Sequence, residues 1–227
     1  MIDAAASVVR HARANRCFLL MVALISTLAV GPWLEEVGAR AVLFVLAGGA
    51  FVSAVQAVGG RRRAAVIVAL ASATLVLVLL TKATSSLPWG ALALVAVVLC
   101  GVCTLVPIFR YIVRAGAITV DKIYAAIGVY LLAGFIWGGV YALVELLRPG
   151  SFQWTQTAVY DPKTFFANFL YLSFVTLASL GYGDITPVTP QARSLALLEV
   201  IFGTFYVVVI IARLVSGFDA SKTGGSS

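Results

Sequence analysis

The sequence predicts an all-α integral membrane protein with six transmembrane helices and one shorter, re-entrant helix. Of its 227 residues, 62% are hydrophobic and only 11% are charged. This apolar fraction exceeds the about 45–50% of soluble domains, so too few charged residues remain to cover a water-facing surface. Apolar runs also recur along the chain at about the 17–25 residues that cross a bilayer. Composition and spacing together therefore favour a multi-pass membrane protein.

Six runs are expected to span the membrane, and glycine, proline or charged residues close each of them. They are 17–34, 41–58, 64–81, 89–109, 123–147 and 193–215. The run 164–178 is apolar but too short to cross, which is typical of a re-entrant helix. The domains expected from this pattern are a basic N-terminus (1–16), a four-helix domain (17–110), a linker (111–122), a second domain (123–218) and a short disordered tail (219–227).

The basic residues predict the orientation of the chain. Most of them lie on one side of the predicted membrane, and this side is expected to be the cytoplasmic one, with both termini on it. The membrane itself is expected to be the plasma (bacterial inner) membrane. The predicted cytoplasmic group is Arg10, Arg13, Arg16, Arg61, Arg62, Arg63, Arg110, Arg114, Lys122, Arg213 and Lys222. The group on the opposite side is Arg40, Lys82, Arg148, Lys163 and Arg193. The net charge of +7 lies in short loops without an aromatic-interleaved patch, so membrane lipids and not nucleic acid are the expected partners.

One polar stretch interrupts the apolar pattern, "SLGYGDITP" at 179–187. It follows the short run directly and therefore begins at membrane depth, where irregular backbone is tolerated only if protein buries it or it lines a water-filled path. Gly181 and Gly183 permit backbone angles that are closed to other residues. Successive carbonyl groups can then point the same way and replace the water shell of a cation. The stretch predicts an ion path lined by backbone oxygens.

The G-Y-G-D sequence after a short apolar helix, with a spanning run on each side, resembles the potassium-channel pore family, whose usual filter signature is T-V-G-Y-G followed by Asp. The resemblance covers 123–218. It implies a passive potassium channel with no enzymatic activity and no cofactor besides the permeant K⁺. One filter loop supplies a quarter of a fourfold ring, so a homotetramer is implied.

The resemblance also implies roles for single residues. The K⁺ ligands would be the carbonyl groups of Ser179, Leu180, Gly181 and Tyr182, with the Ser179 hydroxyl. Residues implied to support the filter and its outer mouth are Thr176, Gly183, Asp184 and Tyr171, the last of which either hydrogen bonds toward Asp184 or packs in the core. In the last spanning run, Gly203 matches the family's hinge or allows close helix packing, and Thr204, Val207 and Ile211 would face a central cavity.

Two acids, Glu145 and Glu199, lie within spanning runs, where an ionisable group is costly and usually has a purpose. We expect them near the outer ends of their helices, bracing the pore helix or the filter. Cys100 and Cys103 form a C-x-x-C on one run without another ligand nearby, which favours ordinary packing.

The filter departs from its family at Ser179, where threonine is usual, and at Leu180, where valine or isoleucine is usual. Both changes remove β-branching and predict a softer innermost ion site, so a weakly selective monovalent cation channel is an alternative. A subunit of a potassium-uptake transporter is another, although such proteins carry four filter-like loops in one chain. Run 89–109 contains no Lys or Arg, so classical voltage gating is not expected. The first four helices are then a degenerate sensor, a lipid-contacting scaffold or a modulator site.

Overall fold

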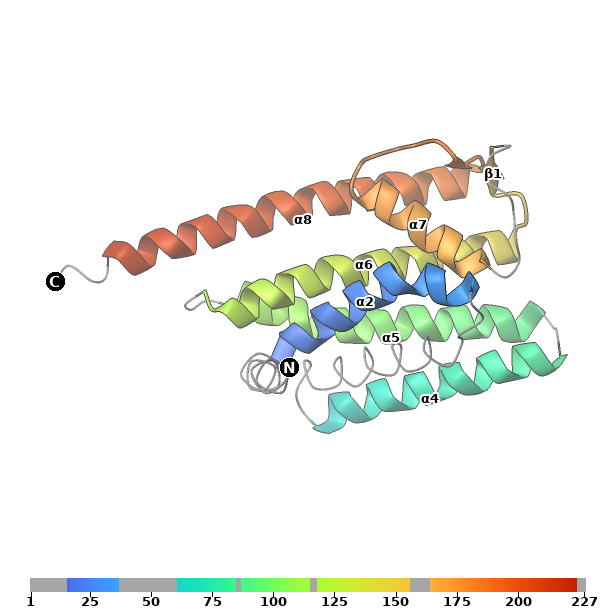
Figure 1. Cartoon of the computed structure of the whole chain (residues 1–227), viewed down its shortest axis with the longest axis horizontal. Coiled ribbons are helices and arrows are strands. Elements are labelled where there is room, and N and C mark those ends of the chain that lie inside the picture. The colour runs from blue at the N-terminus through green and yellow to red at the C-terminus, as the bar shows by residue number, and fades with distance from the viewer. Residues whose placement is uncertain (1–15, 37–60, 85–86, 115–117, 156–163, 224–227) are drawn as a thin grey trace. The chain divides into compact units, whose positions relative to one another are not determined.

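The structure is a computed structural model that describes residues 16–36, 61–84, 87–114, 118–155 and 164–223 (Figure 1). Its helices are α2 (Arg16–Glu36), α4 (Arg61–Thr84), α5 (Leu87–Val113), α6 (Val120–Leu147), α7 (Phe165–Leu177) and α8 (Pro190–Thr223), and its strands are β1 (Phe152–Trp154) and β2 (Ile185–Pro187). These helices coincide with five of the six predicted spans and with the predicted short helix. The predicted span at 41–58 lies outside the described residues.

The length of the apolar stretch within each helix separates two classes. Stretches long and apolar enough to cross a membrane are Pro88–Val113, Val120–Leu147 and Pro190–Arg213, in α5, α6 and α8. The apolar helical stretches in α2, α4 and α7 are shorter, at Cys17–Val30, Ala65–Leu80 and Phe165–Leu177. The part of the chain that the structure describes thus contains three candidate membrane-spanning helices.

Helix α8 is longer than the sequence pattern indicates. It continues to Thr223, past the predicted end of the span at 215 and into the segment for which a disordered tail is predicted. Residues 219–223 include no glycine or proline, so nothing in them stops a helix that is already formed. An apolar span marks where a helix can cross lipid, and the helix itself can extend beyond that span.

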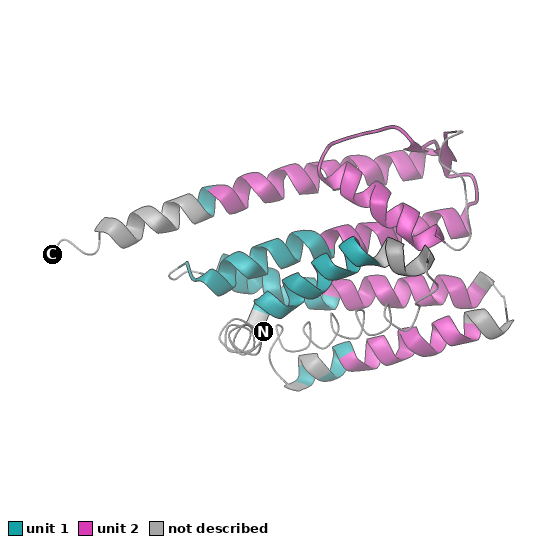
Figure 2. Cartoon of the chain, viewed as in Figure 1, with its two compact units in different colours: residues 1–67, 103–132, 212–227 teal, residues 68–102, 133–211 magenta. Residues whose placement is uncertain are grey.

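The chain divides into two compact units (Figure 2), which are residues 1–67, 103–132 and 212–227, and residues 68–102 and 133–211. In the first unit, the backbone N–H of Cys17 donates to the carboxylate of Asp121 over 3.0 Å. The first N–H groups of a helix lack internal partners and the helix dipole favours an anion beside them, so Asp121 stabilises the start of α2. The rings of Phe18 and Tyr124 meet edge to face nearby.

The first unit also joins the far parts of α5 and α8. The guanidinium of Arg213 donates to the carbonyl oxygens of Val113 and Arg114 over 2.7 and 2.8 Å. The last carbonyl groups of a helix have no internal donors, and a cationic side chain there satisfies them and complements the helix dipole. Arg213 therefore ties the end of α5 to α8.

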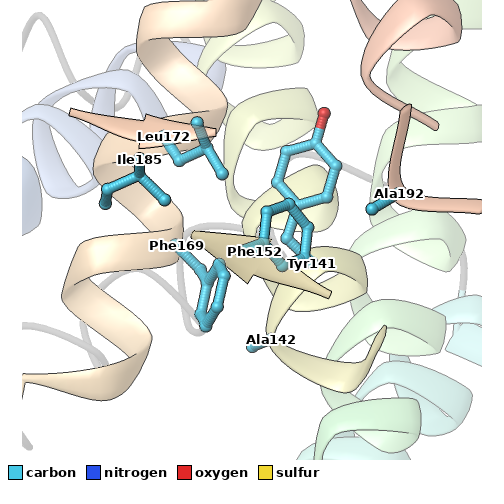
Figure 3. Close-up of a cluster of buried hydrophobic side chains, with 7 residues drawn as sticks. All are labelled: Tyr141, Ala142, Phe152, Phe169, Leu172, Ile185 and Ala192. Carbon is cyan, nitrogen blue, oxygen red and sulfur yellow. The ribbon is translucent and has the colours of Figure 1, made fainter. Parts of the chain in front are cut away.

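The second unit contains an aromatic cluster in which five elements converge (Figure 3). Its buried members are Tyr141 and Ala142 of α6, Phe152 of β1, Phe169 and Leu172 of α7, Ile185 of β2 and Ala192 of α8. The ring of Phe152 meets those of Tyr141 and Phe169 edge to face, with centroids 5.4 and 5.1 Å apart. Edge-to-face pairs add to the free energy gained by burial alone. The cluster anchors α7 between the helices on either side of it in sequence.

Two short strands add to the predicted all-helical fold. β1 and β2 pair antiparallel, with Phe152 opposite Pro187 and Trp154 opposite Ile185. Beyond the ends of this ladder, Thr155 N–H donates to the carbonyl of Asp184 over 3.0 Å, and further backbone bonds run from 188 and 189 to the carbonyl of Ser151. Strands of three residues are too short to show a repeating pattern in the sequence. The ladder fixes the segment before α7 to the segment that follows residues 179–183.

Candidate functional site

Helix α7 packs on α6 through two glycines. A Cβ atom on Gly138 would lie 3.0 Å from the Cα of Leu170, and one on Gly134 would lie 2.5 Å from the Phe174 ring. The two glycines are four residues apart, which is the spacing that lets helices in membranes approach closely. The G-x-x-x-G pattern at 134–138 is the sequence signal for this contact, and it is not among the predictions above.

The end of α7 is closed by hydrogen bonds from the residues that follow it. The N–H of Ser179 donates to the carbonyl of Thr176 over 2.9 Å, and the N–H of Leu180 donates to that of Val175 over 2.8 Å. This pair of bonds is the Schellman motif, in which a left-handed residue ends the helix. Ser179 is that residue, with φ +57°, at a position that glycine usually takes.

The backbone alternates in handedness from residue 179 to 183, which we call the filter segment. Ser179, Gly181 and Gly183 have φ of +57°, +61° and +78°, while φ is negative at Leu180 and Tyr182 between them. No atom lies within 4 Å of a Cβ built on either glycine, so glycine is favoured there by its backbone conformation and not by space. Alternation of right- and left-handed residues turns successive N–H groups to one side and carbonyl groups to the other.

The filter segment is exposed in the single chain. Leu180 and Tyr182 have 56% and 67% of their surface accessible, and Ser179 and Gly181 are exposed as well. The described residues of the same chain therefore cover little of the Tyr182 side chain. On α8, the predicted cavity residues Thr204, Val207 and Ile211 are likewise exposed.

The segment after Gly183 is held by its carbonyl and its side chain. The carbonyl of Asp184 accepts from the N–H of Thr155 and from its hydroxyl, at 3.0 and 3.3 Å. A carboxylate oxygen of Asp184 accepts from the N–H of Ile185 over 3.1 Å. The phenol of Tyr171, which is 41% exposed, interacts with the same carboxylate. The Asp184 carbonyl is thus directed toward Thr155, the residue that follows β1.

A buried polar network lies against α7. Glu199 of α8 is fully buried, and its two carboxyl oxygens meet the hydroxyl groups of Tyr141 of α6 and Ser173 of α7. Ser173 Oγ also lies 2.8 Å from the carbonyl oxygen of Gly134, and the side chain of Thr176 interacts with the Tyr141 phenol. The network joins three helices. Glu199 is recognisable in the sequence as an acid within an apolar run, whereas Tyr141 and Ser173 give no pattern of their own.

Glu145, the second predicted bracing acid, has a different environment. Its carboxylate accepts from the N–H groups of Gly150 and Phe152 over 2.8 and 3.1 Å, and the side chain is half-buried. Both carboxyl oxygens accept from backbone N–H donors, so the two ends of this contact are matched in hydrogen-bonding character. Glu145 thereby holds the turn between α6 and β1.

Gly203 lies where α8 meets the end of α7. A Cβ atom on this residue would be 2.4 Å from the carbonyl oxygen of Leu177, and α8 is helical on both sides of it. The sequence left two roles open for Gly203, a hinge and a site of close helix packing, and the structure shows the close contact between α8 and the end of α7. Bending at Gly203 stays a prediction.

Comparison with known proteins gives matches to parts of the chain. A family model described as "Ion channel" matches residues 129–218. A protein of Oryza sativa subsp. japonica named two pore potassium channel c is 38% identical over 68 residues, which are 30% of this chain but only 14% of the rice protein. Protein LctB of Bacillus caldotenax is 28% identical over 103 residues, 45% of this chain and 76% of that protein. No solved structure matches significantly.

The contact at Gly203 predicts a steric defect. Gly203→Ala is expected to lower the free energy of unfolding in detergent by about 1–3 kcal/mol, because the new methyl group collides with backbone that cannot move aside. Gly128→Ala on α6 is the matched control, since its nearest neighbour would be Leu20 at 3.8 Å. There the helix propensity of alanine should leave stability unchanged or raise it by up to about 1 kcal/mol. Equal effects in the two variants would contradict the packing role.

Proposed function

We propose that this protein is a potassium-selective channel in which four copies surround one pore, because residues 129–218 match an ion-channel family model and part of the chain is similar to a two pore potassium channel. The family is one of ion channels and not of enzymes. In this proposal K⁺ passes down its gradient through a ring of backbone carbonyl groups, one quarter of which comes from each chain.

The observation that carries the proposal is the alternating backbone of the filter segment. Carbonyl groups at Ser179, Leu180, Gly181 and Tyr182 turned to one side would form successive rings of oxygen ligands around a fourfold axis. Four residues span at most roughly 14 Å, the length of fully extended chain. Several ions then fit in single file, and the repulsion between them offsets tight binding.

Other contacts support a filter of fixed shape. The Schellman motif sets its inner end and the bond from Thr155 to Asp184 sets its outer end. Asp184, at the outer mouth, would raise the local concentration of cations. The C-terminal end of α7, including Thr176, would direct the negative end of the helix dipole toward the cavity, where Thr204, Val207 and Ile211 face the ions.

Assembly into a homotetramer agrees with what the single chain leaves exposed. Large apolar side chains of α8 are accessible, including Leu197 and Phe205, each at 65%. In the proposed assembly, neighbouring copies and lipid cover such side chains. In the proposed assembly, each chain crosses the plasma membrane six times. Both termini lie in the cytoplasm, and the outer mouth of the pore faces the outside of the cell. No classical voltage sensor is expected in the first four helices.

A weakly selective cation channel is the second candidate, and Ser179 is the observation that favours it. The left-handed backbone at this residue costs about 1–2 kcal/mol for a residue with a side chain and more for a β-branched one. Serine keeps the hydroxyl ligand at lower strain than threonine would, but its rotamer is less restricted. A less restricted ligand would discriminate less sharply between K⁺ and Na⁺.

Recordings from the purified full chain in planar bilayers test the function. With K⁺ on one side and Na⁺ on the other, we expect a reversal potential far toward the K⁺ equilibrium potential. A reversal potential near zero would identify the weakly selective channel. Absence of any current from reconstituted tetramers, over a range of voltage and pH, would contradict both candidates.

Substitution of the central glycine tests the filter segment directly. Gly181→Ala should abolish K⁺ current, because an L-residue resists the left-handed conformation there and its carbonyl group would leave the row. Among the described residues of one chain nothing lies near the added methyl group, so the variant should fold, and size-exclusion chromatography in KCl should still show tetramers. Gly128→Ala serves as the control with normal current. Normal current in Gly181→Ala would remove this segment from the ion path.

Charge at the outer mouth should matter most at low ionic strength. Asp184→Asn should lower the single-channel conductance in dilute KCl, because the side chain no longer concentrates cations. At about 1 M salt, where the Debye length falls to about 3 Å, the conductances of variant and wild type should converge. A deficit that is the same at every salt concentration would indicate a structural defect and not a lost surface charge.

A further inference from the structure

The buried carboxyl group of Glu199 has an unusual set of neighbours. It is fully buried in α8, and both of its hydrogen-bond partners are hydroxyl groups, those of Tyr141 and Ser173. Glu145, the other acid in this part of the chain, faces two backbone N–H donors instead. An N–H group can only donate, whereas a hydroxyl group can donate and accept. The two acids therefore need not carry the same charge.

Counting protons around Ser173 determines the charge of Glu199. Ser173 Oγ lies 2.6 Å from one carboxyl oxygen of Glu199 and 2.8 Å from the carbonyl oxygen of Gly134. The Gly134 carbonyl can only accept, and the serine hydroxyl has one proton. If Glu199 were ionised, one of these two short contacts would join two oxygens with no proton between them. If Glu199 carries a proton, it donates to Ser173 and Ser173 donates to Gly134.

The surroundings give the same answer on charge. A buried carboxylate is costly unless a cation or several donors compensate it. Among the described residues, the titratable group that contacts Glu199 from a neighbouring helix is the phenol of Tyr141 on α6. Helix α7 presents hydroxyl groups, at Ser173 and beside Tyr141 at Thr176. With its proton, Glu199 donates one hydrogen bond to Ser173 and accepts one from Tyr141, so every hydroxyl and carboxyl group in this network has a partner.

We propose that Glu199 is held as a neutral carboxylic acid and that, in this form, it is a positioning residue that fixes the pore helix α7 to both α6 and α8. The Tyr141 hydroxyl then donates to Glu199, Glu199 donates to the Ser173 hydroxyl, and Ser173 donates to the Gly134 carbonyl. Loss of the proton at alkaline pH leaves Ser173 between two acceptors and places a charge beside the helix that sets the filter. Only the effect on ion flow rests on the proposed function.

Infrared difference spectroscopy tests the protonation itself. The spectrum of the full chain in detergent minus that of Glu199→Gln should show the C=O stretching band of a protonated carboxylic acid at neutral pH, and this band should vanish at strongly alkaline pH. Subtraction cancels the other carboxyl groups. Absence of the band at neutral pH, with a carboxylate band in its place, would overturn the proposal whether or not the protein conducts ions.

Matched variants test the positioning role. Glutamine can donate an N–H to Ser173 and accept from Tyr141, so Glu199→Gln should unfold at the wild-type temperature and lose any alkaline decline in stability. Glu145→Gln is the contrasting control, because glutamine offers one acceptor where Gly150 and Phe152 both donate, and its unfolding temperature should fall. Glu199→Ala should also unfold at lower temperature. A fall in Glu199→Gln as large as in Glu199→Ala would overturn the proposal.

The K⁺ flux of liposomes gives the functional readout. Glu199→Gln should conduct near the wild-type rate at neutral pH and keep that rate at alkaline pH, where wild-type flux declines. If the K⁺ flux of the wild type and that of Glu199→Gln declined together at alkaline pH, another group would be titrating. That result would overturn the link from Glu199 to the filter. If the wild type carries no flux at any pH, the proposed channel function fails, while the infrared and unfolding results still decide the state of Glu199.

Discussion

The hydrogen bonds that close α7 also start the segment that carries the candidate site. Ser179 ends the helix as the left-handed residue of the Schellman motif, and the alternation of backbone handedness continues from it through Gly183. Alternating conformations make neither a helix nor a strand, so the filter segment has no repeating hydrogen bonds of its own. Its shape has to come from the helix end on one side and from the bond between Thr155 and Asp184 on the other.

That dependence explains the construction of the surrounding unit. Gly134 and Gly138 let α7 approach α6, the aromatic cluster around Phe169 fixes its first turns, and Glu199 holds its middle through Ser173. Polar groups are buried here only where they are paired, as a low-dielectric environment requires. Gly203 lets α8 contact the last carbonyl of α7. Together these contacts fix the position of α7, whose end sets the filter segment.

Apolar run lengths predicted the helices well, because burial in lipid needs a fixed number of apolar residues and this is visible in any window. The G-Y-G-D motif also located the candidate site, since glycine at alternate positions limits the possible backbone conformations. The partners of Glu199 could not be predicted. Tyr141 and Ser173 lie 58 and 26 residues from it in sequence, and a single tyrosine or serine in an apolar helix gives no signal of its partner. The three-residue strands were missed because so short a segment shows no period.

The alternating backbone of the filter segment has an energetic consequence. Carbonyl dipoles that point to one side repel one another, and four such chains around an axis would bring the oxygens of each ring together as well. Under the proposed function, the permeant ion relieves this repulsion and is therefore part of the folded assembly as well as its cargo. Its binding would stabilise the tetramer by mass action, about 2.7 kcal/mol at a hundredfold excess over the dissociation constant. Potassium in the purification buffer would then act as a structural ligand of the protein.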